Sequence, residues 1–349
     1  MRRYRDRIAV LAAGAVALTI LVVAPGPAAS ATAGGFAPLD RPGPALSVPE
    51  DQLAAALSCT SSAGAGRETV LFVPGTTVNP TDNYSWNWFR ALDKLGRPYC
   101  AVTLPFDTTG DIQIAAEYVV HAIRAIHART GRRVQVLGHS QGGAVPRFAL
   151  RFWPDLRGMV DDYVAFGATN HGTVIAGPLC TSGCAPAIWQ QAIGSNFVQA
   201  MNSYQETFPE ISYTAIYTHL DQIVQPNLDD QGSTSLHGPG EITNVAVQDL
   251  CPTDTADHIA VGTWDPVAYA LAMDALDHSG PADPRRVPKS VCSEVFMPGV
   301  DPIGFAADLS GAWKKIGSSL ATDPRVNTEP ALKPYTMAER HCCSDISGR

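Results

Sequence analysis

The chain has 349 residues, 45% of them hydrophobic, and a formal net charge of −8 at pH 7. An acidic balance argues against nucleic acid as a partner, because nucleic-acid binding needs a basic face. This length and apolar content are enough for one large α/β domain with a substantial core.

Residues 1–31 are typical of a cleaved secretory signal peptide. Four arginines within the first seven residues precede an apolar run over 8–23, and the small-residue cleavage site Ala29-Ser30-Ala31 follows. A retained membrane anchor is the alternative, but a run of 16 apolar residues is short for a bilayer span. Cleavage would leave 21 basic and 32 acidic residues, a net charge of −11, on a secreted protein.

The mature chain is predicted to begin with an N-terminal arm over 32–48, rich in Ala, Gly and Pro, followed by one domain over 49–349. Strands are predicted over 69–73, 99–104, 134–137, 163–166, 213–217 and 244–247. Helices are predicted over 51–57, 85–95, 112–127, 142–152, 266–278 and 302–316. Because strands and helices alternate, we expect an α/β fold with a mainly parallel sheet covered by helices on both faces.

The segment 172–209 is longer than a simple crossover and is predicted to be a lid-like insertion beside the site. It contains two short predicted helices, over 185–193 and 196–203. The first of these is the candidate for the lid itself.

The pattern Gly138-His139-Ser140-Gln141-Gly142 is a G-x-S-x-G elbow. It stands between the apolar run over 134–137 and a predicted helix, which is the strand-turn-helix setting that this motif requires. The sharp turn would expose the Ser140 hydroxyl, and the helix N-terminus behind it would offer amide donors to an oxyanion. We therefore expect Ser140 to be a nucleophile.

In this architecture an acid and then a histidine follow the serine along the chain. His258 is the predicted base, because it lies just after the last predicted strand and before an apolar segment. Asp221, four residues past a predicted strand, is the predicted acid. Asp254 and Asp257 are the alternatives, but they are very close to His258 in sequence. His171, directly after a strand, is expected to shape the floor of the site.

An oxyanion hole would come from the amide of Gln141 and from the loop Pro74-Gly75-Thr76-Thr77, which closes the first buried strand. Gly75 would let the backbone approach a substrate, and Thr76 could add its hydroxyl to its amide. The alternative is a plain Pro-Gly turn.

An even number of cysteines in an exported chain favours disulfides over free thiols. Zinc is the alternative, but no Cys-x-x-Cys pair is present and the spacings fit no zinc finger, so no metal is expected. Spacing alone leaves 105 connectivities open. The eight are Cys59, Cys100, Cys180, Cys184, Cys251, Cys292, Cys342 and Cys343.

Several motifs follow one another along the chain in a characteristic order. They are Phe72-Val73-Pro74-Gly75-Thr76, Ser140-Gln141-Gly142-Gly143, Gly172-Thr173-Val174, Ala176-Gly177-Pro178-Leu179, Trp189-Gln190-Gln191, Asp221 through Pro226, and Asp257-His258. Together they resemble the Candida antarctica lipase B type of α/β-hydrolase. The similarity runs from about Leu46 to near residue 345.

The resemblance implies an α/β-hydrolase fold, a catalytic triad of Ser140, Asp221 and His258, an oxyanion hole at Thr76 and Gln141, and no metal or other cofactor. For the substrate pocket it implies that Gln191 is a lining residue and that Ile223 belongs to an apolar wall. His139 stands where the prototype of the family has a tryptophan that floors the alcohol-side pocket. Pocket depth and stereospecificity are therefore expected to differ here.

For the cysteines, the resemblance implies the bridges Cys59–Cys100 and Cys251–Cys292. Cys180 and Cys184 are additional to the family and are a third candidate pair. The last bridge of the prototype begins where Thr328 stands here, so it cannot form in the same way. The two adjacent cysteines near the C-terminus stay unassigned.

We predict a secreted serine hydrolase that cleaves carboxylic esters through an acyl-enzyme, with acylglycerols as the expected substrates. A polyester or small-ester hydrolase, or an acyltransferase, with little activity on insoluble lipid is the alternative within this class. A non-catalytic binding protein on a hydrolase fold is the alternative from another class. The expected partners are the ester or lipid substrate and a transient lipid interface, and we expect a monomer.

Overall fold

The computed structural model describes residues 35–64 and 66–339. The predicted signal peptide, the first residues of the predicted arm, and Cys342 and Cys343 lie outside the described residues. In the described part of the chain, no helix combines the length and the apolarity needed to cross a membrane.

One sheet of seven strands forms the centre of the domain, in the order β1-β3-β2-β4-β5-β6-β7. Strands β2 to β7 are parallel, and β1 pairs with β3 in the antiparallel sense. The strands are β1 (Leu57–Cys59), β2 (Thr69–Val73), β3 (Tyr99–Val102), β4 (Val134–His139), β5 (Val160–Phe166), β6 (Ser212–Tyr217) and β7 (Glu241–Ala246). The predicted mainly parallel sheet is confirmed.

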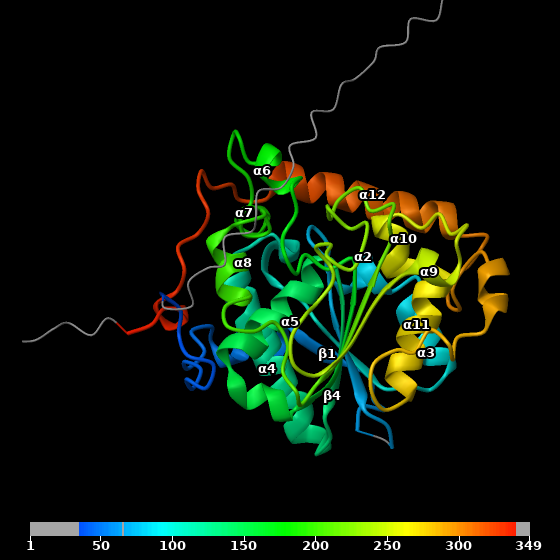
Figure 1. The fold of residues 1–349 in the computed structure, drawn as a ribbon, viewed down its shortest axis with the longest axis horizontal. Coiled ribbons are helices and arrows are strands. Elements are labelled where there is room, and N and C mark those ends of the chain that lie inside the picture. Colours follow the sequence, from blue (N-terminus) through cyan, green and yellow to red (C-terminus); the bar gives the residue numbers. More distant parts are fainter. Residues whose placement is uncertain (1–34, 65, 340–349) are drawn as a thin grey trace, which may run out of the picture. The chain divides into compact units, whose positions relative to one another are not determined.

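Helices cover both faces of this sheet, as Figure 1 shows, with α4, α5 and α8 on one side and α3 and α11 on the other. The long helix α12 crosses the end of the molecule where the parallel strands finish. The α-helices are α1 (Glu50–Ala55), α2 (Pro80–Tyr84), α3 (Trp88–Lys94), α4 (Ile112–Thr130), α5 (Gln141–Phe152), α6 (Ala176–Leu179), α7 (Pro186–Gln190), α8 (Asn196–Met201), α9 (Val247–Leu250), α10 (His258–Thr263), α11 (Pro266–Asp277) and α12 (Phe305–Thr322).

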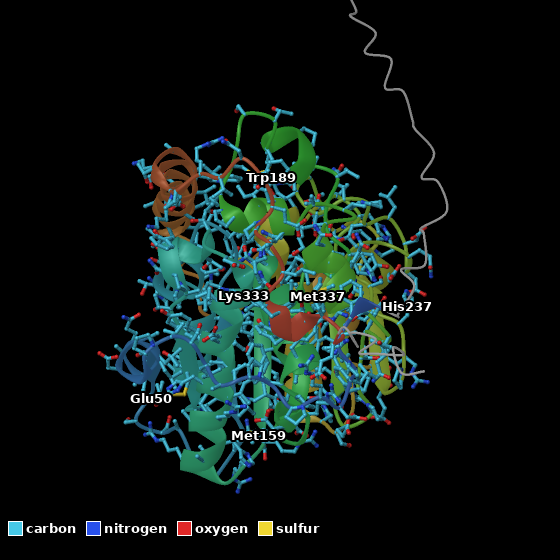
Figure 2. All side chains as sticks on the ribbon, turned by 90° about the vertical axis from the view of Figure 1, so that its left-hand side faces the viewer. Glu50, Met159, Trp189, His237, Lys333 and Met337 are labelled. Atoms are coloured by element: carbon cyan, nitrogen blue, oxygen red, sulfur yellow. A yellow bond between two sulfur atoms is a disulfide. The ribbon has the colours of Figure 1, made fainter. Side chains whose placement is uncertain are left out.

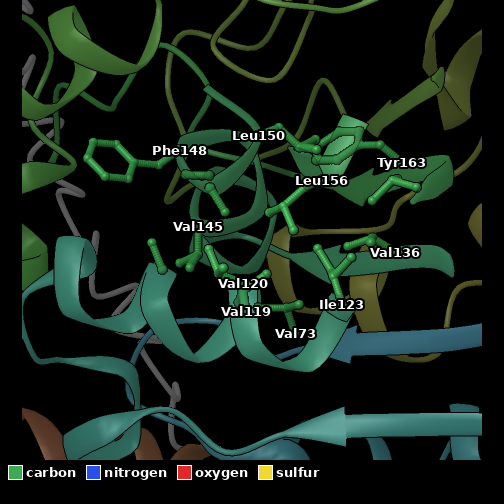
Figure 3. Close-up of a cluster of buried hydrophobic side chains, with 14 of the residues drawn as sticks. Val73, Val119, Val120, Ile123, Val136, Val145, Phe148, Leu150, Leu156 and Tyr163 are labelled. Carbon is green, nitrogen blue, oxygen red and sulfur yellow. The ribbon is translucent and has the colours of Figure 1, made fainter. Parts of the chain in front are cut away.

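The core on the α4 side is built from aliphatic side chains that meet between two helices and the sheet (Figure 3). Val119, Val120 and Ile123 of α4 are buried against Val145 of α5 and Val136 of β4. Apolar residues at 3–4 spacing place one stripe of α4 on the sheet, which is why sequence periodicity found this helix. The Asp111 side chain caps its start, and Gly131 in the left-handed conformation ends it.

Some element boundaries differ from the prediction. The helix predicted over 85–95 is the shorter helix α3, which begins after its cap Asn87. Helix α2, capped by Asn79, lies before it and was not predicted. Strand β1 was missed, since three residues with one exposed side chain carry no readable period. Helix α12 begins at Phe305 and continues to Thr322, past the predicted end.

The described part of the arm packs against α5. The Trp153 indole donates to the Pro44 carbonyl at 3.0 Å, and the buried Arg151 guanidinium donates to the Ala37 carbonyl. Figure 2 shows the C-terminal segment with Lys333 and Met337 crossing the same side of the molecule. Residue Lys333 is held there by a 2.7 Å bond from its amide to the Gln113 side chain. Both ends of the domain are therefore tied to the α4–α5 layer.

The structure shows how the segment predicted to be the lid is packed, and the lid itself stays a prediction. Helix α7, within the segment over 185–193, has Ala187 and Gln190 buried. The Gln190 carboxamide accepts from the Ile112 amide at 2.8 Å and donates to Asp111 at 2.6 Å. These bonds fasten α7 to the start of α4. The length of the segment in the sequence does not distinguish a lid from a buried connection. The elements over the pocket mouth are α6 and α12.

Three disulfides join described cysteines. Cys59–Cys100 links the facing residues of β1 and β3, and Cys251–Cys292 holds the loop after α9 to the segment over 289–293. Cys180–Cys184 closes a small loop directly after α6. These are the two pairs that the resemblance implied and the additional candidate pair.

Candidate active site

Ser140 lies at the turn between β4 and α5 in a backbone conformation that L-residues rarely adopt, with φ 57° and ψ −124°. The turn is tight enough to require glycine on either side. A Cβ at Gly138 would lie 2.1 Å from the Gly142 carbonyl oxygen, and a Cβ at Gly142 would lie 2.1 Å from that of Val73. The spacing of the motif is thus a packing requirement of the elbow.

Asp221 and His258 form a buried pair beside Ser140, with Asp221 Oδ2 at 2.9 Å from His258 Nδ1. Asp221 Oδ1 accepts from the amides of Ile223 at 2.9 Å and Val224 at 2.7 Å. Burial alone would raise the pKa of Asp221, but His258 and these amides outweigh it and hold the pKa below the usual range. An ionised Asp221 requires the proton of a neutral His258 ring on Nδ1, which leaves Nε2 as a base.

The two alternative acids have other contacts. Asp257 caps α10 by accepting from the Ala260 amide at 2.8 Å. Asp254 accepts from the Ala256 amide at 2.7 Å, and its charge contributes to raising the pKa of Asp265. Of the three aspartates considered from the sequence, Asp221 is the one whose carboxylate bonds to the His258 ring.

Ser140 and His258 both line one cavity of about 190 Å³. Most of its other lining residues are apolar, and they come from α6, α7, α10, α12 and the loop after β6. They include Ile175, Ala176, Leu179, Ile188, Ile223, Ile259, Ala312, Trp313, Ile316 and Leu320. A serine–histidine pair in a cavity with a largely apolar lining suits a substrate with one reactive polar group and a hydrocarbon part.

The predicted oxyanion residues are joined in one hydrogen-bonded cluster. The Thr76 hydroxyl donates to Gln141 Oε1 at 2.8 Å. The Gln191 amide nitrogen contacts both, at 3.1 Å from Thr76 Oγ1 and 3.0 Å from Gln141 Oε1. Thr169 in turn donates to Gln191 Oε1 at 3.0 Å. Gln191 therefore holds the two predicted oxyanion residues together as well as lining the cavity.

The other predicted pocket residues differ in exposure. Ile223 lines the cavity with 38% of its surface exposed, at the mouth. His139 also lines the cavity, but it is only 4% exposed and both of its ring nitrogens face protein groups. His171 does not line the cavity: its Nε2 lies 2.8 Å from a Glu206 carboxylate oxygen, so the expectation that it floors the site was wrong.

Two site features had no signal in the sequence. Gly167, at the end of β5, has φ +51°, and a Cβ there would lie 3.0 Å from His258 Nδ1 and 3.2 Å from Asp221 Oδ2. The α12 wall of the cavity comes from a helix about 170 residues past Ser140. Neither belongs to a motif, because each follows from how distant segments meet. Among the described residues, no group of three or more His, Cys, Asp or Glu side chains could hold a metal.

The chain is 31% identical over 317 residues to lipase B of Pseudozyma antarctica, and this covers 87% of this chain and 90% of that protein. The crystal structure of Aspergillus fumigatus lipase B matches with a TM-score of 0.77 at 31% identity, covering 89% of this chain and 77% of that one. A family model described as Lipase (class 2) matches residues 116–262. The likeness thus extends over the domain and is not confined to the elbow.

Proposed function

The chain belongs to the lipase B family of α/β-hydrolases and is an ester hydrolase, and we propose that Ser140, His258 and Asp221 carry out its acyl transfer. The observation that carries this proposal is the Asp221–His258 pair, whose histidine lines the same cavity as Ser140, a serine held in a strained elbow. Strained backbone of this kind persists where function requires it.

In the proposed reaction Ser140 Oγ attacks the ester carbonyl carbon while His258 Nε2 takes the hydroxyl proton. Asp221 keeps the histidine in the correct tautomer and stabilises the imidazolium. His258 then gives the proton to the departing alcohol, and an acyl-enzyme remains on Ser140. Water attacks this ester by the same steps, with His258 again as base and then acid, and the free acid leaves.

The tetrahedral oxyanion is proposed to be held by the amides of Thr76 and Gln141 and by the Thr76 hydroxyl. Gln141 is the first residue of α5, where backbone amides have no partner within the helix. The Thr76 hydroxyl now donates to Gln141 Oε1, so it must exchange that bond for one to the oxyanion. Gln191 would keep Gln141 Oε1 partnered during the exchange.

For the substrate we propose carboxylic esters with an apolar acyl chain, acylglycerols among them. The apolar lining from α6 and α12 supports this class. A panel of p-nitrophenyl esters of increasing acyl length, measured beside emulsified triolein, tests it. Turnover of short esters with none of triolein would favour the small-ester alternative.

We also propose that the mature protein acts outside the cell as a monomer. The predicted cleavage site after residue 31 supports export, and the three disulfides fit an oxidising compartment. All proposed catalytic residues come from one chain. N-terminal sequencing of the secreted protein and light scattering of the purified chain test the two statements.

We expect Ser140→Ala to fold normally and to lose about 10⁴-fold or more in kcat, because triad members act as a unit. Asp221→Asn should also be severely impaired through loss of the correct tautomer. A fluorophosphonate should label wild type on Ser140 and leave Ser140→Ala unlabelled. Near-normal rates for Asp221→Asn, together with a large loss in Asp254→Asn or Asp257→Asn, would make the acid assignment wrong.

A further inference from the structure

The residue next to the nucleophile has both of its ring nitrogens engaged by protein groups. His139 Nε2 lies 2.9 Å from the carbonyl oxygen of His258, and Nδ1 lies 3.3 Å from the Asn83 amide nitrogen. A carbonyl oxygen can only accept, so Nε2 must carry the proton. The amide nitrogen can only donate, so Nδ1 must offer its lone pair. The neutral ring with its proton on Nε2 satisfies both contacts.

The chain of bonds continues beyond Asn83 to the proposed oxyanion loop. Asn83 is buried, and its Oδ1 accepts from the Gly75 amide at 2.9 Å. This bond fixes which end of the Asn83 amide faces His139. Gly75 directly precedes Thr76. One buried chain of hydrogen bonds therefore runs from the oxyanion loop through Asn83 and His139 to the His258 backbone.

The imidazole of His139 is confined as well as bonded. A Cβ at Gly262 in α10 would lie 2.3 Å from its Cδ2 atom, so the ring occupies the space that Gly262 leaves open. The rings of His139 and His258 are 5.0 Å apart between centroids. Burial, with a contribution from the nearby His258, lowers the pKa of His139 to about 3. The ring thus stays neutral, and its donor and acceptor keep their places across the working pH range.

From these contacts we infer that His139 is a positioning residue, which fixes the His258 backbone relative to the Gly75–Thr76 loop. The inference rests on the proposed function, since it concerns where the base and the oxyanion donors stand around Ser140. The two sets of groups come from segments about 180 residues apart in the sequence. Misplacement by about 1 Å can cost about 10²-fold in rate, so one rigid connection between them affects catalysis directly.

The test compares kcat per active site in His139→Phe and His139→Gln, with His171→Phe as the control. Active sites are counted by fluorophosphonate titration, so misfolded protein does not enter the rate. His139→Phe removes the donor and the acceptor, and we expect kcat to fall about 10²-fold with KM within about threefold. His139→Gln restores a donor and an acceptor, and its kcat should be at least about tenfold higher than that of His139→Phe. His171→Phe also removes a bonded histidine, outside the cavity, and should keep the wild-type kcat per site.

Equal kcat per site in wild type and His139→Phe, or no recovery in His139→Gln, overturns the positioning role. Should His139→Phe fail to fold, Asn83→Ala breaks the same series of hydrogen bonds at its next member. A loss of about tenfold in kcat then supports the positioning role, and an unchanged kcat overturns it. A wild type that is not labelled at all overturns the proposed function and this inference together. A labelled, active wild type with insensitive variants overturns this inference alone.

Discussion

Two buried histidines lie side by side near Ser140, and their nearest contacts separate their roles. His258 faces the Asp221 carboxylate, whose pKa is held below its usual range by this pairing and by backbone amides. His139 faces a carbonyl and an amide nitrogen, and burial lowers its pKa to about 3. The Asp221 carboxylate can stabilise the imidazolium that the proposed reaction forms on His258, whereas the hydrogen-bond partners of His139 are neutral. At the scale of single residues, partner chemistry decides which imidazole can take a proton.

Thr76→Val tests the oxyanion proposal at the same scale, because it keeps the amide and deletes the hydroxyl donor. Removing one such donor typically costs about 10²–10³-fold in kcat with little change in KM. Thr169→Val is the matched control, since its hydroxyl contacts Gln191 and not the proposed oxyanion position. We expect a much smaller loss from the control in steady-state assays. An effect of Thr76→Val confined to KM would mean that Thr76 only shapes the pocket.

At the scale of elements, a pair of carboxyl groups joins the loop before α10 to the start of α11. Asp265 caps α11 by accepting from the Ala268 amide at 2.6 Å, and its side chain is buried near the charge of Asp254. Burial and the charge of Asp254 raise the pKa of Asp265 from 3.8 to about 8. The loop that delivers His258 therefore lies beside a carboxyl group whose pKa is raised well above its usual range.

This pair predicts a pH-dependent stability. The unfolded chain loses the Asp265 proton near pH 3.8, whereas the folded chain keeps it until about pH 8. The folded state binds more protons in between, so the free energy of unfolding falls as pH rises from about 4 to about 8. Asp265→Asn keeps the cap and cannot ionise. We expect its Tm, relative to wild type, to rise by at least about 3 °C between pH 5 and pH 8.5.

Asp111→Asn, a change at the N-cap of α4, is the control for the Tm measurement. It alters a capping carboxylate away from the Asp254–Asp265 pair and should shift Tm by a similar amount at both pH values. Parallel Tm curves for wild type and Asp265→Asn would contradict the raised pKa of Asp265.

At the scale of the whole molecule, the cavity opens among exposed apolar side chains. Leu179, Ile223, Trp313 and Leu320 line the cavity and are each between 38% and 55% exposed. The Cys180–Cys184 loop beside them is bonded to the segment after α12, since the Cys184 amide donates to the Val326 carbonyl at 3.1 Å. The mouth is thus open and apolar, and its α6 edge is braced by a disulfide and by a neighbouring segment.

An enzyme with a braced, open cavity mouth should hydrolyse dissolved substrate, and its rate should increase little at an oil–water interface. We expect the rate with tributyrin to rise smoothly through its solubility limit in wild type. Cys180→Ser/Cys184→Ser loosens the α6 edge and should make the rate step up more at that limit. The measurement is rate against tributyrin concentration on both sides of the limit. A sharp jump in wild type that is unchanged in the double variant would rule this out.

The sequence by itself determined the features whose signals are local. The elbow needs Gly138 and Gly142 at fixed spacing because of steric contacts within one turn, so the motif could be recognised without a structure. The buried strands are near-continuous apolar runs, and the long helix α4 has an apolar period that follows from helix geometry. The order of serine, acid and histidine along the chain, with the resemblance, brought Ser140, Asp221 and His258 into one hypothesis.

Only the tertiary structure decided what depends on contacts between distant segments. Its packing fastened α7 to α4 and set α12 over the pocket, which no periodicity indicates. It also showed that His139, one of the residues lining the cavity, is a buried link between Asn83 and the His258 backbone. The physical reason is that a side chain's partners depend on where other segments lie in space. Local sequence specifies its own conformation, and only the packed fold specifies those partners.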